Sequence, residues 1–249
     1  MEKIGIIGGS GFYDLGKEEI NIKTPFGDVK CKKKLISNER EVIFIARHGK
    51  DHGTPPDKVN YRANIYAMHK LNVRAILVTN AVGSFYDELK PGFLVIPHDI
   101  IDFTKNRIYT FFNGNFTTTV NGKKKSGVVH TDVTEPFDNI IRKKLFNISK
   151  EHYENVVFNG VIAVTEGPRF ETPAEINALR RIGATLAGMT SSPEAFLAKE
   201  LEIPYATLAV VTNYVAGMQK KVSHEEVIEM FDKMMPAVKK ILLSTAEKL

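Results

Sequence analysis

The chain contains little of the chemistry that marks secreted, metal-binding or membrane proteins. Cys31 is the single cysteine among 249 residues, so neither an intrachain disulfide nor a cluster of thiolate metal ligands can form. No stretch approaches the roughly 18 uninterrupted apolar residues expected of a membrane-spanning helix. The first residues, MEK, lead directly into a strand pattern, without the apolar region and cleavage site of a signal peptide. We therefore expect a cytoplasmic protein that does not insert into membranes.

The chain also lacks a strong excess of charge of either sign. Lysine and arginine number 34 against 29 acidic residues, which gives a net charge of +5. Part of the excess lies in two lysine runs, Lys32–Lys34 and Lys123–Lys125, which we interpret as solvated loops. Neither run is interleaved with aromatic residues as a nucleic-acid surface would be, so no nucleic-acid partner is expected. A mildly positive balance is more compatible with a small anionic ligand.

Short β-branched runs alternate with longer helical patterns along the chain. Strands are predicted at Ile4–Ile7, Val42–Ala46, Ala75–Thr79, Phe93–Ile96, Val157–Val164, Thr185–Met189 and Thr207–Thr212. Helices are predicted at Lys58–Leu71, Pro136–Tyr153, Pro173–Ile182, Pro193–Leu201 and His224–Lys248, the last with a kink at Pro236. The polar segment Asn106–Gly127 is interpreted as a hairpin or excursion that turns at Asn121-Gly122. The alternation predicts a layered, mostly parallel α/β fold in one domain, residues 1–249.

A glycine-rich loop, GGSG, follows the first predicted strand. It lacks both the G-x-G-x-x-G register of a dinucleotide site and the Gly-Lys-Ser/Thr of a Walker loop. What remains is a strand end with exposed main-chain N–H groups and the hydroxyl of Ser10, which can form a nest for an anion. Taken alone, the loop is equally consistent with a tight turn.

The stretch ARHGKDHGTPP comes directly after another predicted strand. An arginine such as Arg47 can bind an oxyanion in a bidentate manner, and His48 can add a second donor. The alternative is a surface loop that is basic by chance. His48 and His52 have the i, i+4 spacing of a helical zinc site, but the neighbouring glycines and prolines argue against a helix. No metal is therefore expected.

Four further motifs place small or polar residues after predicted strands. They are LVTNAVGS, VTEGPRFETPAE, AGMTSSPEA and AVVTNYVAG. Each taken singly has a turn or a helix cap as its alternative; Thr172, for example, precedes Pro173 as an N-cap would. Since the carboxyl ends of parallel strands meet at one edge of a sheet, the set predicts a composite crevice.

In this order, GGSG, ARHG, VTNAVGS, EGPRFET, GMTSSPEA and VVTNYV resemble the motifs of trimeric purine nucleoside phosphorylases and methylthioadenosine phosphorylases, over nearly the whole chain. The resemblance implies the nucleoside phosphorylase fold, a single α/β domain with a mixed, distorted β-barrel-like sheet flanked by helices. It implies an enzyme that cleaves purine nucleosides with inorganic phosphate to free base and a pentose 1-phosphate. Phosphate is then a co-substrate, and no cofactor or metal is implied.

The same resemblance assigns a phosphate site. Ser10 and the GGSG amides would hold phosphate together with Arg47, His48, Thr190 and the main-chain N–H of Ala81.

It also assigns residues around the nucleoside. Phe170 would pack on the purine face, and Met189 would lie beneath the ribose next to the base. His130, in GVVHTD, resembles the residue that a neighbouring subunit contributes over the sugar. The resemblance therefore implies a homotrimer, or a hexamer made of two trimers.

Two residues bear on which purine is bound. An ionised Glu171 can accept N1–H of a 6-oxopurine, while the amide of Asn213 donates to O6 and accepts from N7–H. Adenine has an acceptor at N1, and a buried mismatched polar pair costs about 1–3 kcal/mol. In the family, Glu and Asn at these places mark the inosine and guanosine branch, whereas adenosine-type enzymes carry Ser and Asp. We predict phosphorolysis of 6-oxopurine nucleosides in purine salvage, with Glu171, Asn213 and His48 as the catalytic residues.

The predicted 5′ site leaves an alternative open. His224, in SHEEV, lies where hydroxyl-binding relatives have a histidine and methylthio-specific relatives an apolar residue. ARHG, VVHTD and the overall length, however, are closer to the methylthioadenosine group. A 5′-methylthioinosine or 5′-methylthioadenosine phosphorylase is therefore the alternative. A non-catalytic nucleoside-binding protein is a further one, and the complete set of Ser10, Arg47, His48 and Thr190 argues against it.

Overall fold

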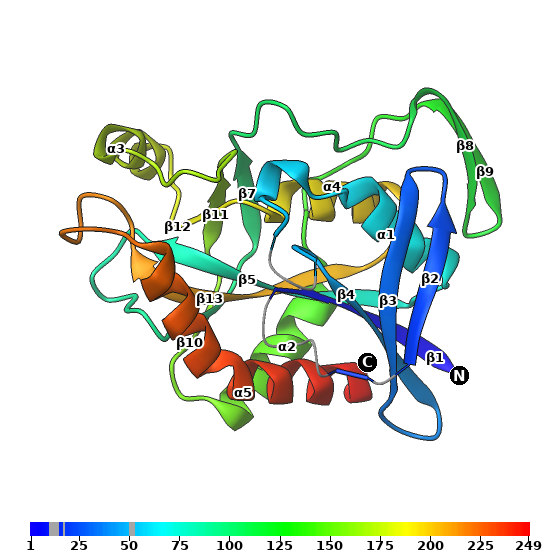
Figure 1. Ribbon diagram of the computed structural model, residues 1–249, viewed down its shortest axis with the longest axis horizontal. Helices are drawn as coiled ribbons and strands as arrows, with labels where there is room; N and C mark the ends of the chain where they lie inside the picture. Colours follow the sequence, from blue (N-terminus) through cyan, green and yellow to red (C-terminus); the bar gives the residue numbers. More distant parts are fainter. Residues whose placement is uncertain (10–14, 17, 50–52) are drawn as a thin grey trace.

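The computed structural model describes residues 1–9, 15–16, 18–49 and 53–249 (Figure 1). In chain order its elements are β1 (Glu2–Gly8), β2 (Glu18–Thr24), β3 (Gly27–Leu35), β4 (Arg40–Ala46), a 3-10 turn (Pro56–Lys58), α1 (Tyr61–Lys70), β5 (Ala75–Ser84), β6 (Leu94–Ile96), β7 (Asp99–Asp102), β8 (Asn113–Val120), β9 (Lys123–Val128), α2 (Asn139–His152), β10 (Val156–Phe158), β11 (Val161–Val164), α3 (Pro173–Arg181), β12 (Leu186–Gly188), α4 (Ser191–Glu200), β13 (Tyr205–Tyr214) and α5 (His224–Lys248).

The centre of the fold is a parallel group of strands. β4, β1, β5 and β13 are neighbours in this order and all run parallel. Antiparallel pairs extend the sheet on both sides, through β3 and β2 beyond β4 and through β6 beyond β13. A branch of β12, β11 and β7 joins the far end of β5. Among the described residues the path of pairs stays open, so the expected barrel-like closure is not reached.

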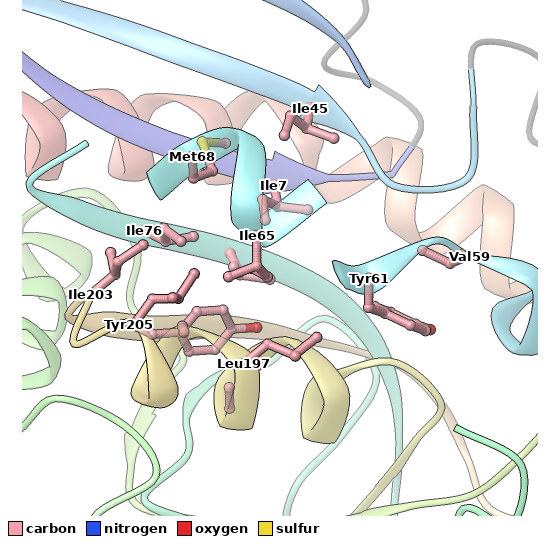
Figure 2. Packing of buried hydrophobic residues seen from close by; sticks show 14 of the residues in the cluster. Ile7, Ile45, Val59, Tyr61, Ile65, Met68, Ile76, Leu197, Ile203 and Tyr205 are labelled. Atoms are coloured by element: carbon pink, nitrogen blue, oxygen red, sulfur yellow. The ribbon is translucent and has the colours of Figure 1, made fainter. Parts of the chain in front are cut away.

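Helices cover both faces of this sheet, with α1 and α4 on one side and α2 and α5 on the other (Figure 1). Adjacent strand residues alternate between the two layers: Ile7 and Val211 belong to the cluster under α1 and α4, Ile6 and Val210 to the cluster under α2 and α5. This alternation follows from the two-residue period of a strand. Because both faces are buried, the central strands consist mostly of apolar residues. Figure 2 shows the first cluster, where side chains of α1 and α4 meet those of the sheet.

Most predicted elements are present, and the strands show several differences. The run Val157–Val164 was expected as one strand but forms β10 and β11, because Asn159 has a φ of 86° and turns the chain. The lysine runs were expected in loops but lie within strands, Lys32–Lys34 in β3 and Lys123–Lys125 in β9. β3 lies between β2 and β4, and β9 pairs with β8, and the lysines of both runs are exposed or half-buried there, so they remain solvated within the strands.

The predicted hairpin and the predicted helix punctuation are confirmed. β8 and β9 pair antiparallel around Asn121-Gly122, whose φ values of 48° and 77° are both left-handed. Thr172 and Glu175 form the reciprocal capping box of α3. The ribbon of α5 changes direction along its length, and Pro236, which lacks the N–H that would bond to the preceding turn, lies inside it (Figure 1). The division of the chain into a single domain, residues 1–249, stays a prediction.

Candidate active site

A cavity of about 500 Å³ lies at the carboxyl ends of the parallel strands. Gly9 follows β1, Arg47 and His48 follow β4, and residues 79–83 belong to β5. The other walls come from the segment after β11, the end of β12, the end of β13 and the first turns of α5. The crevice predicted from strand ends is thus present, and it brings together Arg47, His48, Ala81, Phe170, Glu171, Met189, Thr190, Asn213 and His224.

On one side, β5 pairs with two different strands, and the cavity reaches the sheet in the interval between these two pairings. β1 pairs with β5 as far as Val78, and β12 pairs with it from Gly83 onward. Between these two points, no strand among the described residues pairs with β5 on that side. The carbonyl of Thr79 faces this edge, because it accepts from Arg47 Nη1 at 3.1 Å. Main-chain groups two residues apart in a strand point the same way, so the N–H of Ala81 faces the same opening.

One end of the cavity has the properties of an anion site. Thr190 is the N-cap of α4, but its side chain makes no cap hydrogen bond, so the first N–H groups of the helix keep their donor capacity. Instead Asn80 Nδ2 donates to Thr190 Oγ1 at 3.0 Å and to Ser191 Oγ at 3.1 Å. A hydroxyl that accepts from a fixed donor is left with its own proton to donate. The Thr190 hydroxyl and the N-terminus of α4 therefore offer donors at the part of the cavity that Thr190 lines.

Arg47 and His48 add positive and polar groups at this end. The guanidinium of Arg47 is buried and forms a two-point ion pair with Glu194, at 2.5 Å from Nε to Oε1 and 2.9 Å from Nη2 to Oε2. Burial lowers the pKa of Arg47, but the charge and hydrogen bonds of Glu194 outweigh it and hold that pKa above its ordinary value. His48 Nδ1 donates to the carbonyl of Thr54 at 2.8 Å, which fixes the orientation of the ring. Ser10, the remaining predicted phosphate ligand, lies outside the described residues.

The opposite end of the cavity carries the residues predicted to read the base. Phe170 and Glu171 come from the segment between β11 and α3, and both are partly exposed toward the cavity. Glu171 Oε1 accepts from Thr165 Oγ1 at 2.5 Å, which holds the carboxylate in one orientation. Its second oxygen makes no hydrogen bond within the part of the chain that the structure describes. A carboxylate fixed on one side in this way can accept a ligand N–H on the other.

Asn213 is almost fully buried and lines the same cavity as Glu171. Its Oδ1 accepts from Thr212 Oγ1 at 2.8 Å, and its Nδ2 donates to the carbonyl of Tyr214 at 2.8 Å. Both contacts agree with one orientation of the amide. One N–H and one acceptor position of the amide remain for a ligand. Gly83 allows this placement, since a Cβ there would lie 3.2 Å from Asn213 Nδ2 and 3.0 Å from Val215.

The third wall combines one polar side chain with several apolar ones. His224 is exposed at the start of α5 and reaches the cavity, with Met189 on another wall. Four apolar residues complete the wall near His224: Val222, Val227, Ile228 and Phe231. The predicted histidine therefore lies in a largely apolar surrounding that the sequence did not reveal.

His130 is the one described residue of the predicted set that does not line the cavity. It follows β9, is exposed, and belongs to a part of the fold whose hairpin lies across the molecule from the start of α5 (Figure 1). The prediction that it acts in a neighbouring subunit stays a prediction.

Comparison with known proteins decides the family. The family model described as "Phosphorylase superfamily" matches residues 3–247. This chain belongs to the phosphorylase superfamily. It is 47% identical over 248 residues to a 6-oxopurine nucleoside phosphorylase from Pyrococcus furiosus, covering 98% of this chain and 92% of that protein. It is 42% identical over 239 residues to a probable S-methyl-5′-thioinosine phosphorylase from Methanopyrus kandleri, covering 95% and 88%.

Solved structures agree with the superfamily assignment. The methylthioadenosine phosphorylase from Schistosoma mansoni in complex with tubercidin has a TM-score of 0.88 and 32% identity, covering 99% of this chain and 91% of that one. The nucleoside phosphorylase fold expected from the motifs is therefore confirmed for this superfamily member. No described helix is long and apolar enough to cross a membrane. Within the described ranges, no group of three or more metal-ligating side chains comes together.

Sequence reasoning missed several residues that organise the site of this phosphorylase-superfamily chain. Glu194 in the first turn of α4 and Thr165 before the Phe170 segment both bind predicted site residues. Tyr205, at the start of β13, donates to Glu194 from a fully buried position. An acid after a helix-starting proline is ordinarily explained by the helix dipole, so no pattern in the chain indicates that Glu194 pairs with Arg47.

Proposed function

We propose that the protein catalyses phosphorolysis of 6-oxopurine nucleosides, inosine and guanosine, releasing the free purine and ribose 1-phosphate in purine salvage. The observation that carries this proposal is a single cavity with an anion end and a base end. Donors from Thr190, Arg47 and the start of α4 form the anion end, and Glu171 with Asn213 forms the base end. The names of the Pyrococcus furiosus, Thermococcus kodakarensis and Korarchaeum cryptofilum relatives support the same substrate class.

At the anion end, the protein places phosphate for attack on C1′ of the sugar. Arg47 and the hydroxyls of Thr190 and Ser191 are already oriented by Glu194 and Asn80, so little reorganisation is needed when phosphate binds. Holding phosphate and nucleoside side by side turns a reaction between two solutes into one within a complex. Met189 and the neighbouring apolar wall keep bulk water from the oxocarbenium-like carbon.

At the base end, the departing purine gains negative charge as the C–N bond breaks. The remaining N–H of Asn213 donates to O6, and its Oδ1 accepts from N7–H once N7 has taken a proton from solvent water. Glu171 accepts N1–H with the oxygen that Thr165 does not occupy. The bond from the Asn213 N–H to O6 strengthens as charge develops, which is the property that accelerates the reaction, whereas the Glu171 contact selects the base.

The experiment that tests this function is a set of initial rates with inosine, guanosine, adenosine, 5′-methylthioadenosine and 5′-methylthioinosine, each with and without phosphate. Hypoxanthine release from inosine that requires phosphate supports the proposal. Release that is equally fast without phosphate, or cleavage of adenosine alone, contradicts it.

A second candidate, phosphorolysis of 5′-methylthioinosine, is favoured by the apolar wall around His224. Val227, Ile228 and Phe231 offer a thioether group more burial than a hydroxyl requires. The name of the Methanopyrus kandleri relative points the same way. The ratio of kcat/KM for 5′-methylthioinosine to that for inosine decides between the two candidates.

The proposal includes a homotrimer, alone or paired into a hexamer. It rests on the resemblance of GVVHTD and on the position of His130, which is exposed and lies apart from the cavity of its own chain. In such an assembly His130 completes the sugar site of a neighbouring subunit.

A further inference from the structure

A buried charged cluster lies behind the anion end of the cavity. It joins Arg47 at the end of β4, Glu194 in the first turn of α4 and Tyr205 at the start of β13, with exposed fractions of 4%, 0% and 2%. The Glu194 carboxylate accepts from Arg47 Nε at 2.5 Å, from Arg47 Nη2 at 2.9 Å and from the Tyr205 hydroxyl at 2.9 Å. The three residues come from separate elements, so only the folded chain brings them together.

The cluster fixes the guanidinium of Arg47 in one plane. Glu194 takes two of its five N–H groups and the Thr79 carbonyl takes a third, which leaves two for a ligand in the cavity. Tyr205 fixes the carboxylate in turn, since its ring stacks on Phe137 and lies against α4 (Figure 2). Burial and the charge of Glu194 raise the pKa of Tyr205 well above its ordinary value, so its hydroxyl keeps the proton that it donates.

The Glu194 carboxylate also changes the electrostatic potential that an anionic ligand experiences near Arg47. In the absence of an anion, Glu194 balances Arg47, and a buried cation without a partner would destabilise the fold strongly. When phosphate arrives, its negative charge lies close to that of Glu194 and is opposed by it. We propose that Glu194 is a positioning residue that lowers phosphate affinity while it holds Arg47 in the orientation needed for turnover. This inference rests on the proposed function, because it takes phosphate as the anion.

The variant Glu194→Gln separates these two effects. It keeps the size of the side chain but removes the charge, and its NH₂ group would face one of the two arginine donors. Phosphate would then supply the missing counter-charge, so we expect the KM for phosphate to fall about ten-fold, equivalent to about 1.4 kcal/mol. We expect kcat to fall about ten-fold as well, because the guanidinium loses its fixed plane. The KM for inosine should change by less than about two-fold.

Two further variants serve as controls. Glu200→Gln alters another buried carboxylate of α4, which accepts from the main-chain N–H of Phe111 and does not line the cavity. Its response to phosphate should equal that of the wild type. Tyr205→Phe keeps the ring and all charges but removes one hydrogen bond to Glu194. It should lower kcat a few-fold without lowering the KM for phosphate.

Thermal unfolding with and without phosphate provides a readout that does not depend on activity. Phosphate should raise the Tm of Glu194→Gln more than that of the wild type or of Glu200→Gln. The inference is overturned if the Glu194→Gln variant has an unchanged or higher KM for phosphate, or if its phosphate-dependent Tm shift equals that of Glu200→Gln.

Poor folding of the variant does not remove the test. If Glu194→Gln is insoluble in phosphate-free buffer, phosphate during expression and purification should recover it where NaCl at equal ionic strength does not. Failure of that rescue also overturns the inference. The proposed function is contradicted by a different result, namely base release by the wild type that does not depend on phosphate. Even then, the phosphate-dependent Tm shifts show whether Glu194 opposes the binding of an anion.

Discussion

Replacing Asn213 with aspartate perturbs the most confined part of the base site. Asn213 Nδ2 donates to the Tyr214 carbonyl at 2.8 Å, and the substitution places a carboxylate oxygen against that carbonyl. An ionised carboxylate would also face O6 of a 6-oxopurine, where the amide donates in the wild type. The protonated carboxyl, in contrast, can donate to N7 of adenine. We therefore expect the preference to move from inosine toward adenosine.

The size of the change follows from the contacts that are lost. Removing one hydrogen-bond donor that acts in the transition state costs about 10²-fold in rate, or about 2.7 kcal/mol. Adenosine should change by less than about ten-fold, since Glu171 still faces N1 of adenine. The inosine-to-adenosine ratio of kcat/KM should thus fall by about 10- to 1,000-fold. The lost bond to Tyr214 should lower Tm by about 2–4 °C for each kcal/mol of destabilisation.

The assay is the kcat/KM for both nucleosides at saturating phosphate, measured below the Tm of the variant. Asn147→Asp is the matched control, because Asn147 is exposed on α2 and does not line the cavity. An unchanged ratio in Asn213→Asp would refute the reasoning and show that the amide does not read the base. A wild-type preference for adenosine would refute the assignment of the substrate.

Three further predictions concern other parts of the chain. Arg47→Lys keeps the charge but loses the two-point pair with Glu194, so phosphate titrations should give a KM about ten-fold higher; unchanged phosphate saturation would contradict the anion site. His130→Ala should raise the KM for inosine in an enzyme that sediments as a trimer or hexamer, and a fully active monomer would argue against the shared site. The hydrogen bonds from Arg169 hold the pKa of Glu175 at about 2, below the ordinary 4.5, so its stabilising effect exists above pH 4.5 and is lost as the pH falls through 2. The Tm difference between wild type and Glu175→Gln should therefore shrink between pH 6 and pH 2, and a difference independent of pH would exclude this role.

The fold was predictable wherever local signals and tertiary packing agree. Asn121-Gly122 supplies the left-handed turn of the β8–β9 hairpin, and the Thr172 capping box starts α3 where the sequence places it. The hairpin of β2 and β3 was not predicted, because its lysines suggest a loop and its strands contain few apolar residues. Strand β5 is longer than predicted, since β12 pairs with its far end.

Only the site residues that lie at or beside strand ends could be predicted from the sequence. Arg47, Thr190 and Asn213 lie at or beside strand ends, and the parallel sheet brings strand ends together. Glu194 and Thr165 were not predicted, because their roles depend on which side chains they contact in the folded chain. Such partners are set by the packing of α4 and of the segment after β11, for which a single sequence carries no pattern.

The walls of the cavity come from separate pieces of the chain. The anion end depends on β4, β5 and the start of α4, the base end on the segment after β11 and on β13, and the 5′ wall on α5. Mutations can therefore replace residues of the base wall or the 5′ wall and change the nucleoside specificity, while the residues proposed to bind phosphate stay the same. Gly83 sets one boundary to this freedom, because any side chain there would crowd Asn213. Because the walls come from separate segments, few substitutions are needed to change the substrate. This agrees with the names of the relatives, which include 6-oxopurine and methylthio nucleoside phosphorylases.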